Sequence, residues 1–158
     1  MARKVAIVGV IASVYTVLTV AFAPISYGFV QFRVSEVMTI LPFLTPLAIP
    51  GLFIGAFFAN WWSLLGVVDV VFGSLASLIA AYFTYKMPSK WLAPLPPVLV
   101  NAVIIGTVWG LAAPGEVGII AAMIYVGIGQ LVICYGLGLP VLHLLLRRLG
   151  QSKDSFLR

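Results

Sequence analysis

The chain has 158 residues, of which 63% are hydrophobic and only 8% are charged, and its formal net charge at pH 7 is +5. A soluble domain has about 25% charged residues, so this composition excludes a water-soluble globular protein. Each helical crossing of a bilayer needs about 20 apolar residues, which allows at most about six or seven crossings and leaves no room for a second domain. The apolar runs lack the alternation of a membrane barrel. We therefore predict an all-α integral membrane protein with one domain over residues 1–158.

Proline, glycine and charged residues divide the chain into six apolar blocks, at residues 4–23, 33–45, 49–64, 68–86, 96–113 and 117–147. The first block follows Arg3 and Lys4 as in a signal peptide, but it continues to Phe22 without a clear small-residue cleavage site. We expect it to be retained as a helix. The second block is too short to cross a bilayer alone and needs the lead-in from Gln31 or burial behind other helices.

The sixth block is too long for one crossing. Gly136, Gly138 and Pro140 are expected to bend or interrupt it. Its end would then run along the cytoplasmic surface as an amphipathic tail that carries Arg147 and Arg148.

Basic residues predict the orientation, because cytoplasmic loops are enriched in Lys and Arg. Six crossings from a cytoplasmic start place residues 46–49 and 87–95 inside, and residues 24–32, 64–67 and 113–116 outside. Only Arg33 of the nine basic residues then falls outside. The others fall inside, and they are Arg3, Lys4, Lys86, Lys90, Arg147, Arg148, Lys153 and Arg158. Topology and anionic lipid account for the positive charge, so a nucleic-acid partner is not needed.

Ionisable groups near the hydrocarbon are costly, so the few in this chain are candidates for function. Of the four acidic residues, Asp154 and Glu116 fall in polar segments and are expected to be solvated. Glu36 and Asp69 begin the second and fourth blocks, which places both toward the extracellular end together with Arg33. In the simpler structural interpretation, Arg33 and Glu36 form an ion pair on a helix surface and a helix N-terminus stabilises Asp69. We favour a ligand site, because apolar valines flank Asp69.

Several polar and aromatic residues interrupt the apolar helices and extend this candidate site. An amide can also serve only to join neighbouring helices, and Trp and Tyr also populate membrane interfaces, so each of these signals is weak alone. Carboxylates with aromatic rings would suit a planar, polar ring compound with adjacent N–H donors. The residues that we assign to substrate binding beside Glu36, Asp69 and Arg33 are Tyr15, Asn60, Trp61, Asn101 and Gln130.

Small residues at spacings of three and four form two stripes that permit close helix packing. Gly51, Gly55 and Ala59 form the stripe of the third block, for which we expect packing within this chain. The stripe of the first block is equally compatible with packing and with a partner interface. Its candidate interface residues are Ala2, Ala6, Gly9 and Ser13.

The sequence contains neither a pattern of metal-binding residues nor a phosphate-binding ATPase motif. Cys134 is the only cysteine and is expected to be a buried thiol, and His143 is expected to lie at the membrane surface. We expect no metal site and no cofactor, because the chain has no cluster of His and Cys with metal-ligand spacing. The chain also has no G-x-x-x-x-G-K-[ST] motif, so the energy for any transport must come from a partner or a gradient.

The chain contains several long stretches with a family-specific order of residues. These stretches are ASVYTVLT from residue 12, AFAPISYGFVQFRVSE from residue 21, IPGLFIGAFFAN from residue 49, DVVFGSLASL from residue 69 and WLAPLPPVLVNA from residue 91. In these stretches the chain resembles the QueT family, the proposed importers of queuosine precursors among the S components of energy-coupling factor (ECF) transporters. The resemblance implies six helices, an outward pocket closed by the first loop, and a 7-deazaguanine cargo such as the aminomethyl form, the cyano form or queuine.

The same resemblance implies partners and a location. It implies a membrane coupling subunit and two ATPases, with docking through the small-residue face of the first helix, in the plasma membrane of a prokaryote. The usual A-x-x-x-A pattern is intact here at Ala2 and Ala6, with Gly9 and Ser13 further on. The alternatives are a proton-coupled carrier that uses Glu36 or Asp69, a purely structural membrane subunit and, with least support, an intramembrane enzyme, for which no nucleophile and base can be named.

Overall fold

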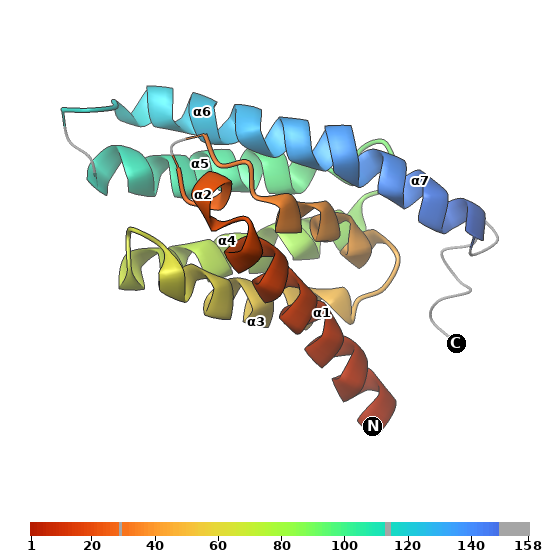
Figure 1. The fold of residues 1–158 in the computed structure, drawn as a ribbon. Helices are drawn as coiled ribbons and strands as arrows, with labels where there is room; N and C mark the ends of the chain where they lie inside the picture. The colour runs from red at the N-terminus through yellow and green to blue at the C-terminus, as the bar shows by residue number, and fades with distance from the viewer. Residues whose placement is uncertain (29, 113–114, 149–158) are drawn as a thin grey trace.

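The computed structural model describes residues 1–28, 30–112 and 115–148 (Figure 1). Over these residues the chain is helical and contains no β-strand, which confirms the predicted all-α class. The elements in chain order are α1 (Ala2–Ala21), α2 (Ala23–Ser26), the 3₁₀ helix η1 (Val34–Phe43), α3 (Ala48–Ala59), the 3₁₀ helix η2 (Asn60–Trp62), α4 (Val67–Lys86), α5 (Leu95–Ala112), α6 (Ile119–Leu131), the π-helical segment η3 (Val132–Gly138) and α7 (Leu139–Arg148).

Four helical segments in the described part of the chain are long and apolar enough to cross a membrane. They are Ala2–Ala21, Val67–Lys86, Leu95–Ala112 and Ile119–Arg148. Val34–Phe43 and Ala48–Trp62 are shorter apolar helices. A 3₁₀ helix rises about 2 Å per residue, so η1 is about 20 Å long and shorter than a hydrocarbon core of about 30 Å. This agrees with the expectation that the second block is too short to cross alone.

The sixth block forms one continuous helical segment, Ile119–Arg148, in which the helix type changes. Gly136 and Gly138 lie in η3, where the hydrogen-bonding pattern changes from α to π, and α7 then continues roughly in the direction of α6 (Figure 1). Pro140 has no N–H to donate to a preceding carbonyl, and a local π segment accommodates such a defect without ending the helix. The expected interruption therefore takes the form of a change of helix type, and the position of the tail along the membrane surface stays a prediction.

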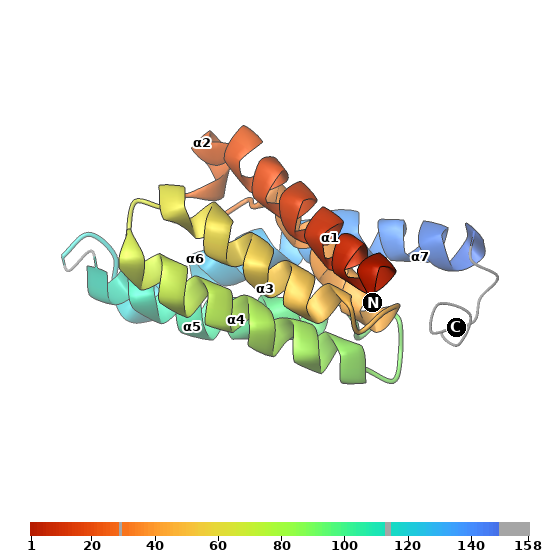
Figure 2. The same ribbon diagram turned by 90° about the horizontal axis from the view of Figure 1, so that it is seen from below.

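Close helix packing depends on glycine at several crossings. α1 packs on α3, α3 on α4, α4 on α5 and α5 on α6, as the two views show (Figure 2). A Cβ atom on Gly55 of α3 would lie 2.9 Å from the carbonyl oxygen of Ala12 and from Cβ of Tyr15 in α1. Gly51 approaches Ile11 in the same way, and Ala59 is fully buried. These contacts confirm that the stripe of the third block packs within the chain.

The short helix η1 lies in the middle of the bundle, where it contacts α1, α3, α4, η3 and α7 (Figure 1). Ile40, Phe43 and Leu44 at its end pack with Ala93 and Leu142 in a hydrophobic cluster. Neighbouring helices rather than lipid therefore surround the backbone of η1, which lets a short helix end at membrane depth. Glu36, near the start of η1, is placed inside the protein.

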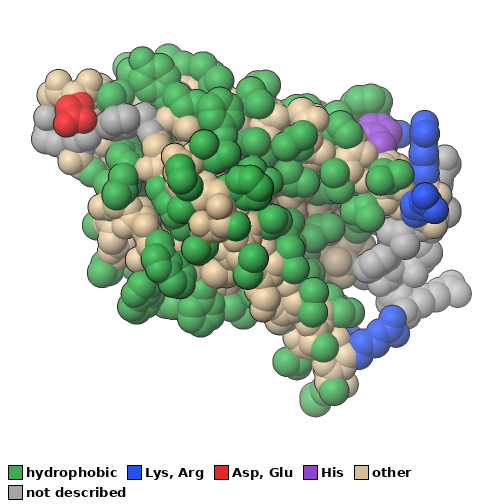
Figure 3. Space-filling view, in the orientation of Figure 1, with side chains coloured by type: hydrophobic (Ala, Val, Ile, Leu, Met, Phe, Trp, Pro, Cys, Tyr) green, Lys and Arg blue, Asp and Glu red, His purple; other side chains and the backbone are tan. Residues whose placement is uncertain are grey.

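The basic side chains gather at one end of the molecule. Figure 3 shows Lys and Arg side chains where α1 begins and α7 ends, whereas the acidic patch visible on this face lies at the opposite end. Lys90, from the α4–α5 connection, lines a small pocket with His143, Leu146 and Arg147, so this connection belongs to the same end. The ring of His143 packs edge-on against Trp91, 4.9 Å between centroids. Lys153 and Arg158, which were expected on this side, lie outside the described residues.

Candidate functional site: a buried cluster of ionisable side chains

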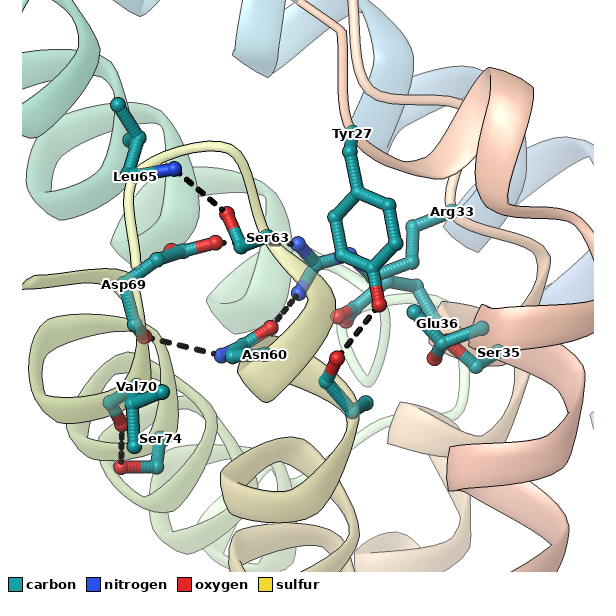
Figure 4. Close-up of polar contacts among 12 residues, drawn as sticks. Tyr27, Arg33, Ser35, Glu36, Asn60, Ser63, Leu65, Asp69, Val70 and Ser74 are labelled. Carbon is teal, nitrogen blue, oxygen red and sulfur yellow. Dashed lines mark hydrogen bonds and ion pairs between the residues drawn. The ribbon is translucent and has the colours of Figure 1, made fainter. Parts of the chain in front are cut away.

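Arg33 lies at the centre of a polar cluster that the helices enclose (Figure 4). It directly precedes η1 in an extended backbone conformation, and 4% of its surface is exposed. Its Nη1 donates a hydrogen bond to Oδ1 of Asn60 at 3.0 Å, and its Nη2 is 3.7 Å from Oδ2 of Asp69. The Tyr27 ring covers the guanidinium, with its centroid 5.5 Å from Cζ. Arg33 thereby connects the first loop with α3 and α4.

Asn60 fixes the position of Asp69 relative to Arg33. Asn60 follows α3 directly, and its Nδ2 donates to the backbone carbonyl of Asp69 at 3.0 Å (Figure 4). Asp69 lies in the first turn of α4, where the helix dipole favours a carboxylate. Both side chains are fully buried. Gly73, one turn further along α4, leaves space for the Asn60 amide, because a Cβ atom at this position would overlap with Nδ2.

Glu36 occupies the other side of the cluster, in the first turn of η1. The hydroxyl of Tyr15 in α1 donates to its Oε1 at 2.5 Å. Asn101 of α5 also faces this carboxylate and interacts with it electrostatically. Arg33 lies between Glu36 and Asp69 (Figure 4). Thus α1, η1, η2, α4 and α5 each bring a polar side chain to one place.

A second layer of polar contacts holds η1 and the first loop in position. The hydroxyls of Thr19 and Ser35 are 2.6 Å apart, and Tyr27 donates to the carbonyl of Ala59 at 2.5 Å. The thiol of Cys134 donates to Oε1 of Gln130 at 3.5 Å. The same thiol contacts the backbone carbonyl of Glu36 in η1. These contacts join the cluster to α6 and η3.

The first loop approaches α6 very closely. A Cβ atom on Gly129 of α6 would lie 2.7 Å from the carbonyl oxygen of Gln31. Gln31 itself is 2% exposed. The backbone at residue 31 therefore packs directly on the helix, and the loop covers the cluster from this side.

The cluster has more buried polar atoms than internal hydrogen bonds. Among the described residues, Oε2 of Glu36, both carboxylate oxygens of Asp69, Nε and Nη2 of Arg33, and Nε2 of Gln31 have no hydrogen-bond partner. Leaving a buried polar group unsatisfied costs about 1–3 kcal/mol, and more for a charged group. Such groups in a membrane protein commonly mark a substrate or ion pathway. The arrangement can offer acceptors and donors to a polar molecule.

The structure differs from the simpler interpretation, in which the charged side chains lie on helix surfaces without a ligand. Arg33 and Glu36 are both buried, and the ion pair found in the described part of the chain joins Arg33 to Asp69 instead. The helix N-terminus at Asp69 is present, as that interpretation required. Asp69 nevertheless has zero exposed surface. The interpretation that Arg33 and Glu36 form an ion pair on a helix surface is therefore wrong.

The structure brings most of the predicted site residues together. Asn101 lies beside Glu36 and Gln130 beside Cys134, while Tyr15, Arg33, Glu36, Asn60 and Asp69 form the contacts described above. Trp61 does not join them, because 66% of its surface is exposed and its ring packs against Phe57. The ring stands at the end of α3, a position typical of an aromatic anchor at a membrane interface.

Tyr27, Gln31, Thr19 and Ser35 belong to the cluster or its supporting layer but were not predicted as site residues. Polar residues in a loop and hydroxyls in a helix are common, so their types alone carry no signal. The run from Tyr27 to Glu36 contains a tyrosine, an amide and both ionisable groups, and this density was the available signal. No group of three His, Cys, Asp or Glu that could hold a metal ion occurs in residues 1–28, 30–112 and 115–148.

The small residues predicted for a partner interface lie on an open face of α1. Ala2, Ala6, Gly9 and Ser13 are all exposed, and only 17% of the apolar window of this helix is buried. A Cβ atom on Gly9 would meet nothing within 4 Å. This stripe therefore does not serve packing within the described part of the chain.

A helical protein with four candidate membrane spans in its described residues and a buried, ionisable polar site has the architecture of an integral membrane transport protein. A family model described as the QueT transporter matches residues 5–147. This match covers nearly the whole sequence, and the chain belongs to the QueT transporter family.

A curated relative gives the comparison more detail. The "Queuosine precursor transporter QueT" of Lactococcus lactis subsp. cremoris is 35% identical over 74 residues, which are 46% of this chain and 43% of that protein. The aligned part thus spans less than half of either protein. No solved structure matches the chain.

Proposed function

We propose that this protein is the membrane-embedded substrate-binding (S) subunit of an ECF-type, ATP-driven importer, and that its cargo is a queuosine precursor of the 7-deazaguanine class. The observation that carries the proposal is the buried cluster, in which Glu36 and Asp69 retain carboxylate oxygens without hydrogen bonds. Membership of the QueT transporter family supports transport. The relative named a queuosine precursor transporter supports the cargo class.

The chemistry of the cargo matches the free acceptors. A guanine-like ring presents two adjacent N–H donors, and a carboxylate accepts such a pair through two parallel hydrogen bonds. Glu36 is assigned to this edge, because Tyr15 already orients its Oε1. Asp69 is the alternative acceptor. Arg33, Asn60, Asn101 and Gln130 supply further polar contacts around the ring.

Cargo would enter from the extracellular side after movement of the first loop. Tyr27 and Gln31 cover the cluster, and the side chains of Arg33, Glu36, Asn60 and Asp69 are at most 4% exposed. A ligand therefore needs the part of this loop around Gln31 to move away from α6. This loop lies opposite the basic end, which supports an orientation with the loop outside and the basic end in the cytoplasm.

The proposed assembly is a single six-helix domain over residues 1–158 in the cell membrane, with both termini in the cytoplasm. Its six helical rods are α1, η1, α3 with η2, α4, α5 and the continuous α6–η3–α7 rod. ATP-driven import requires a membrane coupling subunit and two ATPase subunits, since the chain has no phosphate-binding ATPase motif. The open stripe of Ala2, Ala6, Gly9 and Ser13 suits close contact with a helix of the coupling subunit.

A stand-alone proton-coupled carrier is the second candidate. Buried carboxylates such as Glu36 and Asp69, whose oxygens are partly free of hydrogen bonds, are the groups that carry protons in carriers. Purified protein in liposomes separates the two functions. A carrier accumulates labelled 7-deazaguanine in response to a proton gradient without partners, whereas an S subunit accumulates it only with the coupling subunit, the ATPases and ATP.

Glu36→Gln tests the site directly. The change preserves the shape of the side chain but replaces one acceptor with a donor and removes the charge. Hydrogen bonds to charged groups contribute about 1.5–3 kcal/mol each, so affinity for a 7-deazaguanine ligand should fall by about tenfold or more. Calorimetry on purified protein in lipid nanodiscs measures the affinity.

The matched control is Glu116→Gln, which makes the same chemical change at an exposed position in the α5–α6 connection. This variant should bind like the wild type. Equal affinities of wild type and Glu36→Gln would remove Glu36 from the site. The same result for Asp69→Asn would leave carboxylate recognition without support.

A further inference from the structure

The two carboxylates of the cluster are satisfied to different degrees. Glu36 accepts a hydrogen bond from Tyr15 and has Asn101 beside it. Neither carboxylate oxygen of Asp69 accepts a hydrogen bond within the described residues, and its ion-pair partner Arg33 is 3.7 Å away. This separation is too long for a hydrogen bond. Asp69 is therefore the carboxylate with the most unused capacity to bind a cation.

The charges of the cluster do not balance. Two carboxylates and one guanidinium leave one negative charge in excess when all three groups are ionised, and all three side chains are at most 4% exposed. In the described part of the chain, no second basic side chain joins them. Water does not screen such a charge, so an additional positive charge at the site would be strongly attracted. A protonated amine on the cargo would supply it.

We propose that Asp69 selects the cargo by charge, so that the site prefers a 7-deazaguanine with a protonated aminomethyl group to an otherwise similar neutral derivative. This inference rests on the proposed function. The ring edge with its two N–H donors binds Glu36, and the ammonium group on the opposite side of the ring binds Asp69. Arg33 lies between the two carboxylates (Figure 4). In this position it would contact the middle of the bound ring.

The backbone geometry around Asp69 supports this division of roles. Asn60 holds the Asp69 carbonyl, which leaves the carboxylate free for another partner. Asp69 also lies in the first turn of α4, close to the N-terminal end of the helix. Nε and Nη2 of Arg33 make no hydrogen bonds to the described residues, so Arg33 can shift when an ammonium group pairs with Asp69.

Three ligands that share the ring test the inference on the wild-type protein in nanodiscs. They are aminomethyl-, hydroxymethyl- and cyano-7-deazaguanine, of which the first two are nearly equal in size and differ in charge. A charge-assisted hydrogen bond to a buried carboxylate predicts that the aminomethyl form binds about tenfold or more tightly than the hydroxymethyl form. The cyano form should bind no better than the hydroxymethyl form.

Asp69→Asn should abolish this preference. Its affinity for the aminomethyl ligand should fall to within about threefold of its affinity for the hydroxymethyl ligand, while hydroxymethyl binding should stay near the wild-type value. Glu36→Gln should weaken both ligands to a similar extent, because both share the ring edge. Glu116→Gln should change neither. If Asp69→Asn does not fold, the ligand pair on the wild-type protein still tests selection by charge, and equal binding of the two ligands overturns it.

The outcomes separate this inference from the proposed function. Equal binding of the aminomethyl and hydroxymethyl ligands to the wild type would overturn charge selection and leave the cargo class intact. A preference that survives in Asp69→Asn would assign the selection to another group and also overturn the inference. If none of the three ligands binds, the proposed cargo class fails together with the inference.

Discussion

The side-chain amide of Asn60 makes two hydrogen bonds, one to the first loop and one to α4. It accepts from Arg33 of the first loop and donates to the backbone of Asp69 in α4. One amide therefore sets the position of both the cation and the acid next to it. An amide at this position is useful because it provides a donor and an acceptor at once, which neither a carboxylate nor a lysine can do.

Gly73→Ala tests how tightly Asn60 must fit. The added methyl group would overlap with Nδ2 of Asn60 and would lie 2.9 Å from Oδ1 of Asp69. Overpacking of this kind costs about 1–3 kcal/mol, which outweighs the gain of up to about 1 kcal/mol from replacing glycine in a helix. We expect a lower thermal unfolding midpoint in detergent and weaker ligand binding.

Gly9→Ala is the matched control for this substitution. Gly9 is also helical, but a Cβ atom there would meet nothing within 4 Å. The isolated protein should keep or slightly raise its midpoint, since the helix propensity improves without a clash. A midpoint that drops equally in both variants would show that the effect of Gly73→Ala does not come from Asn60.

At the scale of elements, α1 has one face that packs on α3 and one face that is open, so substitutions on the two faces should have different effects. Gly51 and Gly55 of α3 hold the buried face of α1, whereas Gly9 and Ser13 lie on its free face. Gly9→Leu or Ser13→Phe should therefore weaken assembly with the coupling subunit and leave ligand affinity of the isolated protein largely unchanged. Co-purification with a tagged coupling subunit measures assembly, and calorimetry measures binding.

A matched pair of outcomes decides which surface docks. Gly55→Leu should instead disturb the α1–α3 contact and reduce both folding and binding, because its neighbours are the backbone of Ala12 and Cβ of Tyr15 in α1. Unchanged assembly in Gly9→Leu and Ser13→Phe would move the interface toward Ala2 and Ala6 or to another helix.

The extents of the helices could be predicted well where charge and proline mark their ends. The blocks at 68–86 and 96–113 correspond to Val67–Lys86 and Leu95–Ala112. The type of η3 could not be predicted, since its nearly uniform apolar sequence has no polar face from which a helical period could be read. The continuation of α6 through η3 into α7 was missed for the same reason. In η1, Ser35, Glu36 and Thr39 are too few over ten residues to separate a period of 3.0 from one of 3.6.

The candidate site was predictable to the extent that charge in an apolar sequence is rare. Arg33, Glu36 and Asp69 were recognised on this ground, and the structure places them together. The roles of Tyr27 and Gln31 depend on how the first loop folds back onto Gly129, which is a tertiary contact without a local sequence pattern. Trp61 was assigned to the site by its proximity to Asn60 in sequence, but consecutive residues at a helix end point in different directions.

For the whole molecule, the concentration of basic side chains at one end predicts the orientation in the membrane. Pro88 in the α4–α5 connection and Glu116 in the α5–α6 connection are both exposed, and they lie beyond opposite ends of α5. In intact cells, an impermeant thiol reagent should label Glu116→Cys, and it should label Pro88→Cys only after permeabilisation.

Cys134 provides the background for this experiment, because it is buried in the structure and should not react. Labelling of Pro88→Cys but not of Glu116→Cys in intact cells would invert the orientation. It would also place the first loop on the cytoplasmic side, contrary to uptake from outside.

The difference in length between neighbouring helices has a consequence for the surrounding lipid. At about 1.5 Å per residue, α3 with 12 residues is about 18 Å long, and the 3 residues of η2 add about 6 Å, whereas α4 with 20 residues is about 30 Å long. Ile54, Phe57 and Phe58 of α3 are exposed, and the exposed rings of Trp61 and Trp62 follow within a few residues. Acyl chains that match α4 are too long for α3, so the bilayer must thin or the helices must tilt on the α3 side. The hydrophobic thickness around this protein is therefore uneven around its circumference.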